Sequence, residues 1–222
     1  MQVSKNQLQG SRGLTLIEIL GVIAIMGLLA AVIIPSIQSV NEKAYKTKAA
    51  SHLRQLVLAY TVSLQSGEAS ALNACDSIHD LAAHLAKKAN LNDPQLWVLD
   101  KDPLQDDKAK AVKSILGADQ KPSAAFKALP LSFTFVVKLG HGLSPSTTPI
   151  AWSRGLQEDG TWDAEKGLWG STGGLIAFLD GHVEWYDNLK DADKQLCHPQ
   201  TYTATANFKE ALGATAKILP GN

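Results

Sequence analysis

The distribution of apolar and polar side chains divides the chain into an apolar N-terminal segment and a longer mixed region. Between residues 14 and 34, Thr15 and Glu18 are the only polar side chains. At 1.5 Å per residue, a helix of this length is about 32 Å long, close to the thickness of one hydrocarbon core. The pattern therefore predicts a transmembrane helix over residues 14–35.

A helical pattern continues beyond the apolar segment. From Val40 to Leu64, apolar side chains recur at steps of mostly three and four residues, which predicts an amphipathic continuation over residues 36–66. Pro35 is expected to kink or locally melt this helix, because proline removes a backbone donor and clashes with the preceding turn. Gly67 is the predicted C-cap.

The middle of the chain has a less regular pattern. Ser77 and Asp80 form a capping-box pattern that predicts the start of a helix over residues 77–89. The whole stretch 67–130 is interpreted as a helical and loop insertion that packs beside the long helix.

Strand patterns dominate residues 131–187, which predict an antiparallel β-sheet. Asp180-Gly181 is expected to form a two-residue hairpin turn. This register places four side chains on one face, against the long helix: Phe178, Val183, Ile176 and Trp185. Residues 188–222 are expected to be a C-terminal tail with a short helix near Phe208, and an ordered cap and a loose tail are the two alternatives. The fold class is therefore α+β, with a long N-terminal helix packed on a small antiparallel sheet.

Charge and cysteine content narrow the function classes. Lys and Arg number 21 and Asp and Glu number 21, so the formal charge is zero and no nucleic-acid partner is expected. Cys75 and Cys197 lack the CxxC spacing of a zinc knuckle. If this region is exported, the two thiols can form one disulfide, and two unpaired buried thiols are the alternative.

Other candidate chemistry is sparse. No catalytic constellation is apparent, so the protein is not expected to be an enzyme. The Asp-rich stretch around Asp100, Asp102, Asp106 and Asp107 has the oxygen ligands that Ca²⁺ takes, although the spacing matches no EF-hand loop. No other cofactor and no other metal site is expected. Trp162 and Trp169 are candidates for an exposed pair that contacts a neighbouring subunit or a cargo.

The residues around Glu18 carry the most specific signal. A carboxylate in an apolar helix is costly unless it is paired. The sequence Gly13-Leu14-Thr15-Leu16-Ile17-Glu18 closely resembles the processing site of type IV pilins and type II secretion pseudopilins. The family usually has Phe where this chain has Leu14.

The resemblance implies a sequence of processing steps. Residues 1–13 would be a leader peptide that a prepilin peptidase removes by cutting between Gly13 and Leu14. The new amino terminus, Leu14, would be N-methylated. Glu18 would then pair with the Leu14 amine of a neighbouring subunit and set the register of filament assembly.

The predicted hairpin has a second resemblance. Bacterial pilin-like proteins with a C-terminal His-x9-Asp-Gly box have a similar hairpin sequence. Here Gly173-Gly174 and Phe178-x-Asp180-Gly181-His182-Val183 match, whereas Gly170 stands where the box has its histidine.

Together these features predict a structural pilin-like subunit of a type II secretion system or type IV pilus-type machine. The resemblance implies four partners: prepilin peptidase, other pilin-like subunits, an assembly platform protein and a cytoplasmic ATPase. Lys5 and Arg12 predict a single-pass inner-membrane protein with a cytoplasmic N-terminus and a periplasmic head. The alternative is a membrane-tethered periplasmic binding protein or enzyme with an uncleaved signal-anchor. An ordinary secretory signal fits less well, because the apolar run is longer than a usual signal core.

Overall fold

The computed structural model describes residues 15–105, 107–140, 142–191, 193 and 195–221. The chain separates into two compact units, Met1–Lys46 and Thr47–Asn222. We call the second unit the head. Helix α1 (Leu16–Ser63) begins in the first unit and ends in the head, where an antiparallel sheet follows it. The expected α+β class is therefore confirmed.

In the first unit, α1 is one uninterrupted stretch of α-helix. It continues through Pro35, so the backbone shows no melted segment at the predicted membrane edge. A kink at Pro35 stays a prediction. Gly13 and Leu14 lie outside the described residues.

In the head, the last turns of α1 present one buried face. Ala49, Leu53, Leu56 and Tyr60 are fully buried, at the three- and four-residue steps that the sequence predicts. The helix ends in a π-helical turn (Leu64–Glu68) that contains Gly67 with φ +82°. Glycine adopts this left-handed conformation without the steric penalty of a Cβ, as expected at a helix C-terminus.

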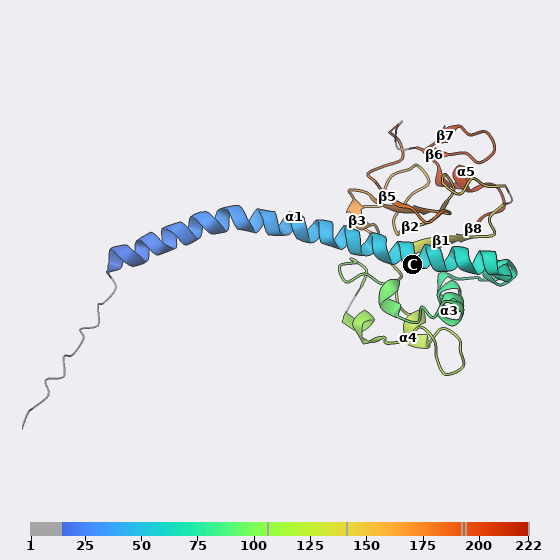
Figure 1. Cartoon of the computed structure of the whole chain (residues 1–222), viewed down its shortest axis with the longest axis horizontal. Helices are drawn as coiled ribbons and strands as arrows, with labels where there is room; N and C mark the ends of the chain where they lie inside the picture. The colour runs from blue at the N-terminus through green and yellow to red at the C-terminus, as the bar shows by residue number, and fades with distance from the viewer. Residues whose placement is uncertain (1–14, 106, 141, 192, 194, 222) are drawn as a thin grey trace, which may run out of the picture. The chain divides into compact units, whose positions relative to one another are not determined.

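Short helices follow α1 along the chain. Their bounds are α2 (Ala69–Asn73), α3 (Ile78–Lys88), two 3₁₀ turns (Pro94–Leu96 and Asp107–Ala111) and α4 (Ala124–Lys127). Helix α3 starts at the expected capping box, in which Ser77 and Asp80 each accept from the other's backbone N–H. Within the head, α3 and α4 lie on one side of α1 and the sheet lies on the other (Figure 1).

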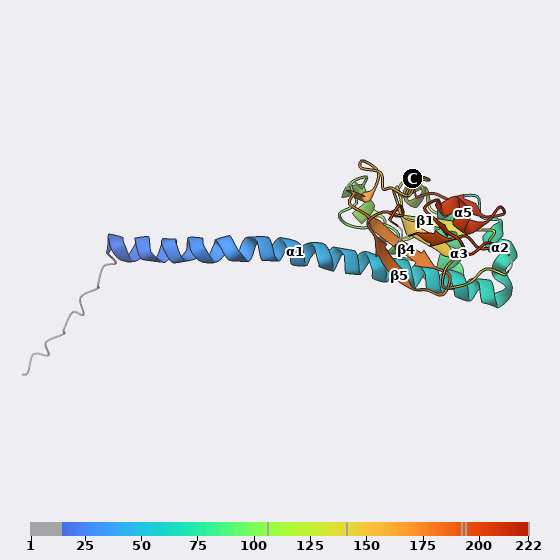
Figure 2. The ribbon, with the colours of Figure 1, turned by 90° about the horizontal axis from the view of Figure 1, so that it is seen from above.

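The main sheet has five antiparallel strands in the order β5-β4-β2-β1-β8. Their bounds are β1 (Phe133–Val137), β2 (Pro149–Ser153), β4 (Gly174–Phe178), β5 (Val183–Tyr186) and β8 (Lys217–Leu219). Strand β3 (Leu168–Ser171) lies outside this sheet, and β6 (Leu196–Cys197) pairs only with β7 (Ala204–Thr205). In both ribbon views the last turns of α1 run beside the main sheet (Figure 2).

The sheet is covered on both faces. On one face, the Phe135 ring lies 6.1 Å from the Tyr60 ring of α1 and 5.4 Å from the Trp97 ring. On the other face, the Trp152 ring lies 5.0 Å from Phe208 of α5 (Phe208–Leu212). All five residues of β1 are consequently buried, which a strand that alternates between core and solvent would not show.

The predicted register of the β4–β5 hairpin is wrong by one residue. Ala177 pairs with Val183 and Ile176 with Glu184. The connection is a three-residue loop rather than a two-residue turn: Phe178 N donates to His182 O, and Gly181 N donates to Phe178 O. Gly181 has φ +91°, as in a hairpin in which a turn is followed by a left-handed residue.

Because of this slip of one residue, the side chains of β4 and β5 that were predicted to share one face lie on opposite faces of the hairpin. Ile176 and Phe178 therefore do not face α1. They belong to a second core together with Trp152 and Phe208. Val183 and Trp185 lie on the other face of the hairpin, so the four predicted core residues do not form one set.

The boundary predicted at residue 187 is also wrong. The segment after it supplies α5, in the place where a short helix was expected, and β8, which pairs with β1. Leu189, Leu196 and Leu212 are buried in the second core. The described residues after 187 are thus an ordered part of the head, which agrees with the alternative of an ordered cap and not with a loose tail.

Candidate functional site

The N-terminal end of α1 carries a closed hydrogen-bond arrangement between Thr15 and Glu18. Thr15 N and Thr15 Oγ1 each donate to Glu18 Oε2 at 2.7 Å. In return, Glu18 N donates to Thr15 Oγ1 at 3.3 Å. This is a capping box of the Thr-x-x-Glu type, which satisfies backbone donors that have no partner inside the helix. The negative carboxylate also lies at the positive end of the helix dipole.

The helix surface that follows Glu18 is apolar on all sides. None of the residues in its most apolar 18-residue stretch is buried in the structure. The large exposed side chains of this part of α1 are Leu16, Ile17, Ile19, Leu20, Val22, Ile23, Ile25, Met26, Leu28, Leu29, Val32, Ile33, Ile34, Ile37 and Val40. A helix that is apolar all round is stable only inside a large core or a membrane. By length and composition, α1 is able to cross a membrane.

The predicted processing residues Gly13 and Leu14 lie directly before this arrangement, outside the described residues. The described part of the site therefore consists of Thr15, Glu18 and the apolar surface of α1. The sequence pattern predicted that Glu18 pairs with a neighbouring subunit. It did not predict the hydrogen bonds from Thr15 of the same chain to the Glu18 carboxylate.

In the head, the loop between β4 and β5 lies against α1. Asp180 Oδ1 accepts from His182 N at 3.0 Å and lies 2.6 Å from His182 Nδ1. The His182 ring stacks on Phe178, with centroids 4.2 Å apart. A Cβ built on Gly181 would lie 3.1 Å from Leu58 Cδ2. Gly181 therefore lies close to the Leu58 side chain of α1.

The electrostatics of the hairpin loop follow from these contacts. Partial burial raises the pKa of Asp180, but the hydrogen bonds from His182 outweigh it and hold the pKa below its ordinary value. The hydrogen bonds between Asp180 and His182 close the loop, and this structural role accounts for both residues. They do not adjoin a nucleophile among the contacts of the described residues.

The Asp-rich stretch does not form a calcium site among the described residues. Asp100 pairs with Lys48, and its hydrogen bond from Lys48 lowers its pKa. Asp102 is buried and pairs with Arg154. Within the described ranges, no group of three or more His, Cys, Asp or Glu side chains is arranged to hold a metal ion. Asp106 lies outside the described residues, and nothing is described of the Asp107 side chain.

Of the two alternatives for the cysteines, the disulfide is not formed. Cys75 and Cys197 are both free thiols. Cys75 lies between α2 and α3 and donates to Ala71 O at 3.5 Å. Cys197 belongs to β6, which packs with α5 beyond the opposite face of the sheet. The alternative of unpaired thiols therefore holds, with Cys75 buried and Cys197 half-buried.

The two tryptophans that were expected to form an exposed pair, Trp162 and Trp169, lie in different surroundings. Trp162 is buried in the second core. Trp169 of β3 instead packs edge-on against Trp185 of β5, with ring centroids 5.0 Å apart. The Trp162–Trp169 surface that was proposed for a neighbouring subunit or cargo is therefore not formed.

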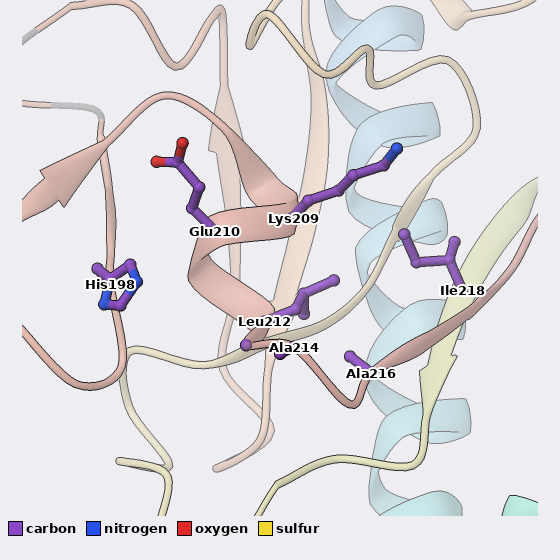
Figure 3. A pocket seen from close by; sticks show the side chains of 8 residues that line it. His198, Lys209, Glu210, Leu212, Ala214, Ala216 and Ile218 are labelled. Carbon is purple, nitrogen blue, oxygen red and sulfur yellow. The ribbon is translucent and has the colours of Figure 1, made fainter.

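A cleft of about 450 Å³ lies between α5 and β8, lined in part by His198, Lys209 and Glu210 (Figure 3). Its charged groups are already engaged: Lys209 pairs with Glu158, and Glu210 accepts from Thr205 Oγ1 at 2.6 Å. In the close-up, the Lys209 side chain points away from His198 and Glu210. The cleft therefore assembles no acid–base pair.

Comparisons of the chain with protein-family models, with curated proteins and with solved structures find no match in any of the three. The function of this protein is consequently inferred from the residues and geometry of this chain alone.

Proposed function

We propose that this protein is a pilin-like structural subunit, processed between Gly13 and Leu14 and assembled into a periplasmic filament. The observation that carries the proposal is a carboxylate, Glu18, at the start of a helix that is apolar on all sides. The machine would be a type II secretion system or a type IV pilus-type assembly.

The Thr15–Glu18 arrangement supports a two-stage role for the carboxylate. Before assembly, Thr15 satisfies Glu18 within the same chain, which lowers the cost of holding a charge near hydrocarbon. After cleavage, the amine of Leu14 becomes a competing partner of opposite charge. The ammonium of a neighbouring subunit has a full positive charge, which neither Thr15 N–H nor its hydroxyl supplies, and near hydrocarbon that charge needs a partner of opposite sign. Assembly would therefore exchange Thr15 for this ammonium as the partner of Glu18.

The second candidate is a membrane-tethered periplasmic protein with an uncleaved signal-anchor. The same capping box favours it, because Glu18 already has a partner in its own chain and does not require a second subunit. Under this alternative, α1 is only an anchor and the head acts alone.

The two candidates differ in the first residue of the mature chain. We propose to purify the protein from membranes of a host that carries a prepilin peptidase and to determine its N-terminus by mass spectrometry. N-methylated Leu14 is expected for the filament subunit. A retained Met1 would contradict it and favour the anchor. A Gly13→Leu variant, which removes the small residue before the cut, is the matched control and should keep the full-length N-terminus.

A further inference from the structure

A hollow of about 330 Å³ lies on the head where α2, α3, α4 and the loop before Pro122 meet. Its basic side chains are Lys87 of α3, Lys121 of the loop and Lys127 of α4. Asp80 and His84 also line it, and the remaining lining residues are small or apolar. We call this hollow the lysine pocket.

The three lysines reach the lysine pocket from three separate elements. The loop that carries Lys121 is held in place by a β-bridge between Leu116 and Pro122 and by the hydrogen bond from Gly117 N to Lys121 O at 2.8 Å. Lys87 and Lys127 stand on the helices to either side. The convergence is therefore produced by the tertiary fold and not by a run of lysines in the sequence.

These lysines differ from several other lysines of the chain, which pair with a carboxylate. Among the described residues, Lys87, Lys121 and Lys127 form no salt bridge, although each is exposed. Several other lysines do pair with a carboxylate: Lys46, Lys48, Lys88, Lys190, Lys209 and Lys217. Three ammonium groups against the single carboxylate of Asp80 leave an excess of positive charge in the pocket lining.

The carboxylates in and near the pocket keep their charge but accept hydrogen bonds from groups other than the side chains of the three pocket lysines. Asp80 Oδ2 accepts from Ser77 Oγ at 2.7 Å and from Ser77 N at 3.2 Å, which ties this carboxylate to the start of α3. Glu68 accepts from Lys88 Nζ at 2.7 Å. Asp119 accepts from Lys121 N at 3.1 Å and does not line the pocket. None of the three is bound to a pocket lysine side chain in the described structure.

The imidazole of His84 supplies a further polar group. Its Nε2 is buried without a hydrogen-bond partner among the described residues and lies 4.0 Å from Glu68 Oε2. Burial lowers the pKa of His84; the charge of Glu68 opposes this effect, and Lys88 and Lys87 add to it. The ring therefore reports the local charge and is sensitive to an anion placed among the lysines.

We propose that the lysine pocket binds a phosphoryl group. Lysine ammonium groups act as point charges that suit a tetrahedral oxyanion, whereas planar carboxylates are matched by the arginine fork, which the pocket lacks. The volume accommodates a phosphate together with a small substituent. This site is independent of α1 processing and of filament assembly.

Binding is tested on the full chain in a neutral detergent by calorimetric titration with inorganic phosphate. The Lys121→Gln, Lys127→Gln double variant is expected to bind phosphate at least about tenfold more weakly. Lys166→Gln, an exposed lysine on a different loop, is the control for a loss of surface charge and should bind like the parent. Near-ultraviolet circular dichroism checks that each variant is folded.

The results separate three outcomes. Phosphate binding that is lost only in the pocket variants supports the proposal. Equal affinity for acetate and phosphate would overturn it, since the site would then select charge and not a tetrahedral group. Absence of phosphate binding up to ~20 mM would also overturn it.

Two sources can supply the phosphoryl group, namely free phosphate and a phosphomonoester lipid headgroup. A second titration uses micelles that contain phosphatidic acid and follows the His84 ring resonances by NMR. A His84 shift with soluble phosphate and with phosphatidic acid indicates a site open to both, and a shift with soluble phosphate alone assigns the free anion. A failure of both ligands to move the His84 resonances would contradict the assignment.

Discussion

Arg154 Nη2 donates to Asp102 Oδ1, and both side chains are buried in the head. The other two guanidinium nitrogens also donate: Nη1 to Leu131 O at 2.8 Å and Nε to Lys166 O at 2.9 Å. Asp102 Oδ2 accepts from Ser132 Oγ at 2.6 Å. This one pair joins the start of β1, the end of β2, the loop before β3 and the loop after Trp97.

The buried pair predicts an asymmetric effect of substitution. Arg154→Met should destabilise the head by about 3–5 kcal/mol, because it leaves the Asp102 carboxylate buried and unpaired. Arg154→Met combined with Asp102→Leu should recover a large part of this loss. Urea unfolding followed by tryptophan fluorescence measures both. A double variant as unstable as the single one would show that packing, and not the uncompensated charge, determines the loss.

Substitutions at Glu18 separate its two proposed roles. Glu18→Gln keeps an acceptor for Thr15 N–H but removes the charge, so α1 should stay capped while filament assembly falls to background. Glu18→Ala removes both the cap and the charge. Thr15→Ala removes the hydroxyl alone, with an expected cost to the helix end of about 1 kcal/mol.

Assembly of these variants is followed by cross-linking and by electron microscopy of sheared filaments, with N-terminal mass spectrometry as the control for processing. Normal filaments from Glu18→Gln would rule out a charge pair with the neighbouring amine. Normal filaments from Thr15→Ala would leave that charge pair intact and remove only the proposed role of the intrachain cap.

The hairpin loop predicts a site-specific strain. Gly181→Ala places a Cβ on a residue with φ +91° and only 3.1 Å from Leu58 Cδ2. The left-handed conformation alone costs about 1–2 kcal/mol, and the contact adds to it. In a Leu58→Ala background the added contact should disappear while the conformational part remains. Thermal unfolding of the four proteins measures this; equal losses in both backgrounds would refute a clash with Leu58.

The two thiols should differ strongly in reactivity. Burial raises the pKa of the Cys75 thiol to about 11, so about 0.1% of it is thiolate at pH 8. Cys197 is half-buried and more accessible. Iodoacetamide at pH 8 should therefore label Cys197 well before Cys75, as read by peptide mass spectrometry. Equal labelling of the native protein, with unfolded protein as the control, would contradict the burial of Cys75.

Asp159 predicts an acid-dependent loss of stability. Hydrogen bonds from the Thr161 side chain and then from Lys190 lower the pKa of Asp159 to about 2. Because the folded-state pKa lies below the ordinary aspartate pKa of about 3.9, the stabilisation is present above about pH 4 and is lost as the pH falls towards 2. Asp159→Asn should flatten the pH dependence of unfolding in this window. An unchanged pH profile would show that the carboxylate does not stabilise the fold.

The local patterns of the sequence were sufficient for much of the helical structure. The apolar periodicity of α1 and the Ser77–Asp80 capping box depend on neighbours within one or two turns, so each can be read without knowing the fold. The left-handed Gly67 at the end of α1 is likewise a local feature that the sequence predicts without knowledge of the fold.

Features that depend on tertiary partners were missed. The hairpin register is decided by a three-residue loop closed through Gly181, which the Asp-Gly pair alone does not distinguish from a two-residue turn. β8 is too short to give an alternating pattern, and the pairing of Arg154 with Asp102 spans 52 positions. At the candidate site, Glu18 was recognised, whereas its bond to Thr15 was not.

The pairing of β8 with β1 has a consequence for how the head is made. Gly221 N donates to Thr134 Oγ1 across 87 positions of the chain. If the proposed export route is correct, the sheet stays incomplete until β8 has been synthesised and threaded across the bilayer. Until then, chaperones at the exit side would meet the open edge of β1, and proteases could recognise a subunit released before β8 arrives.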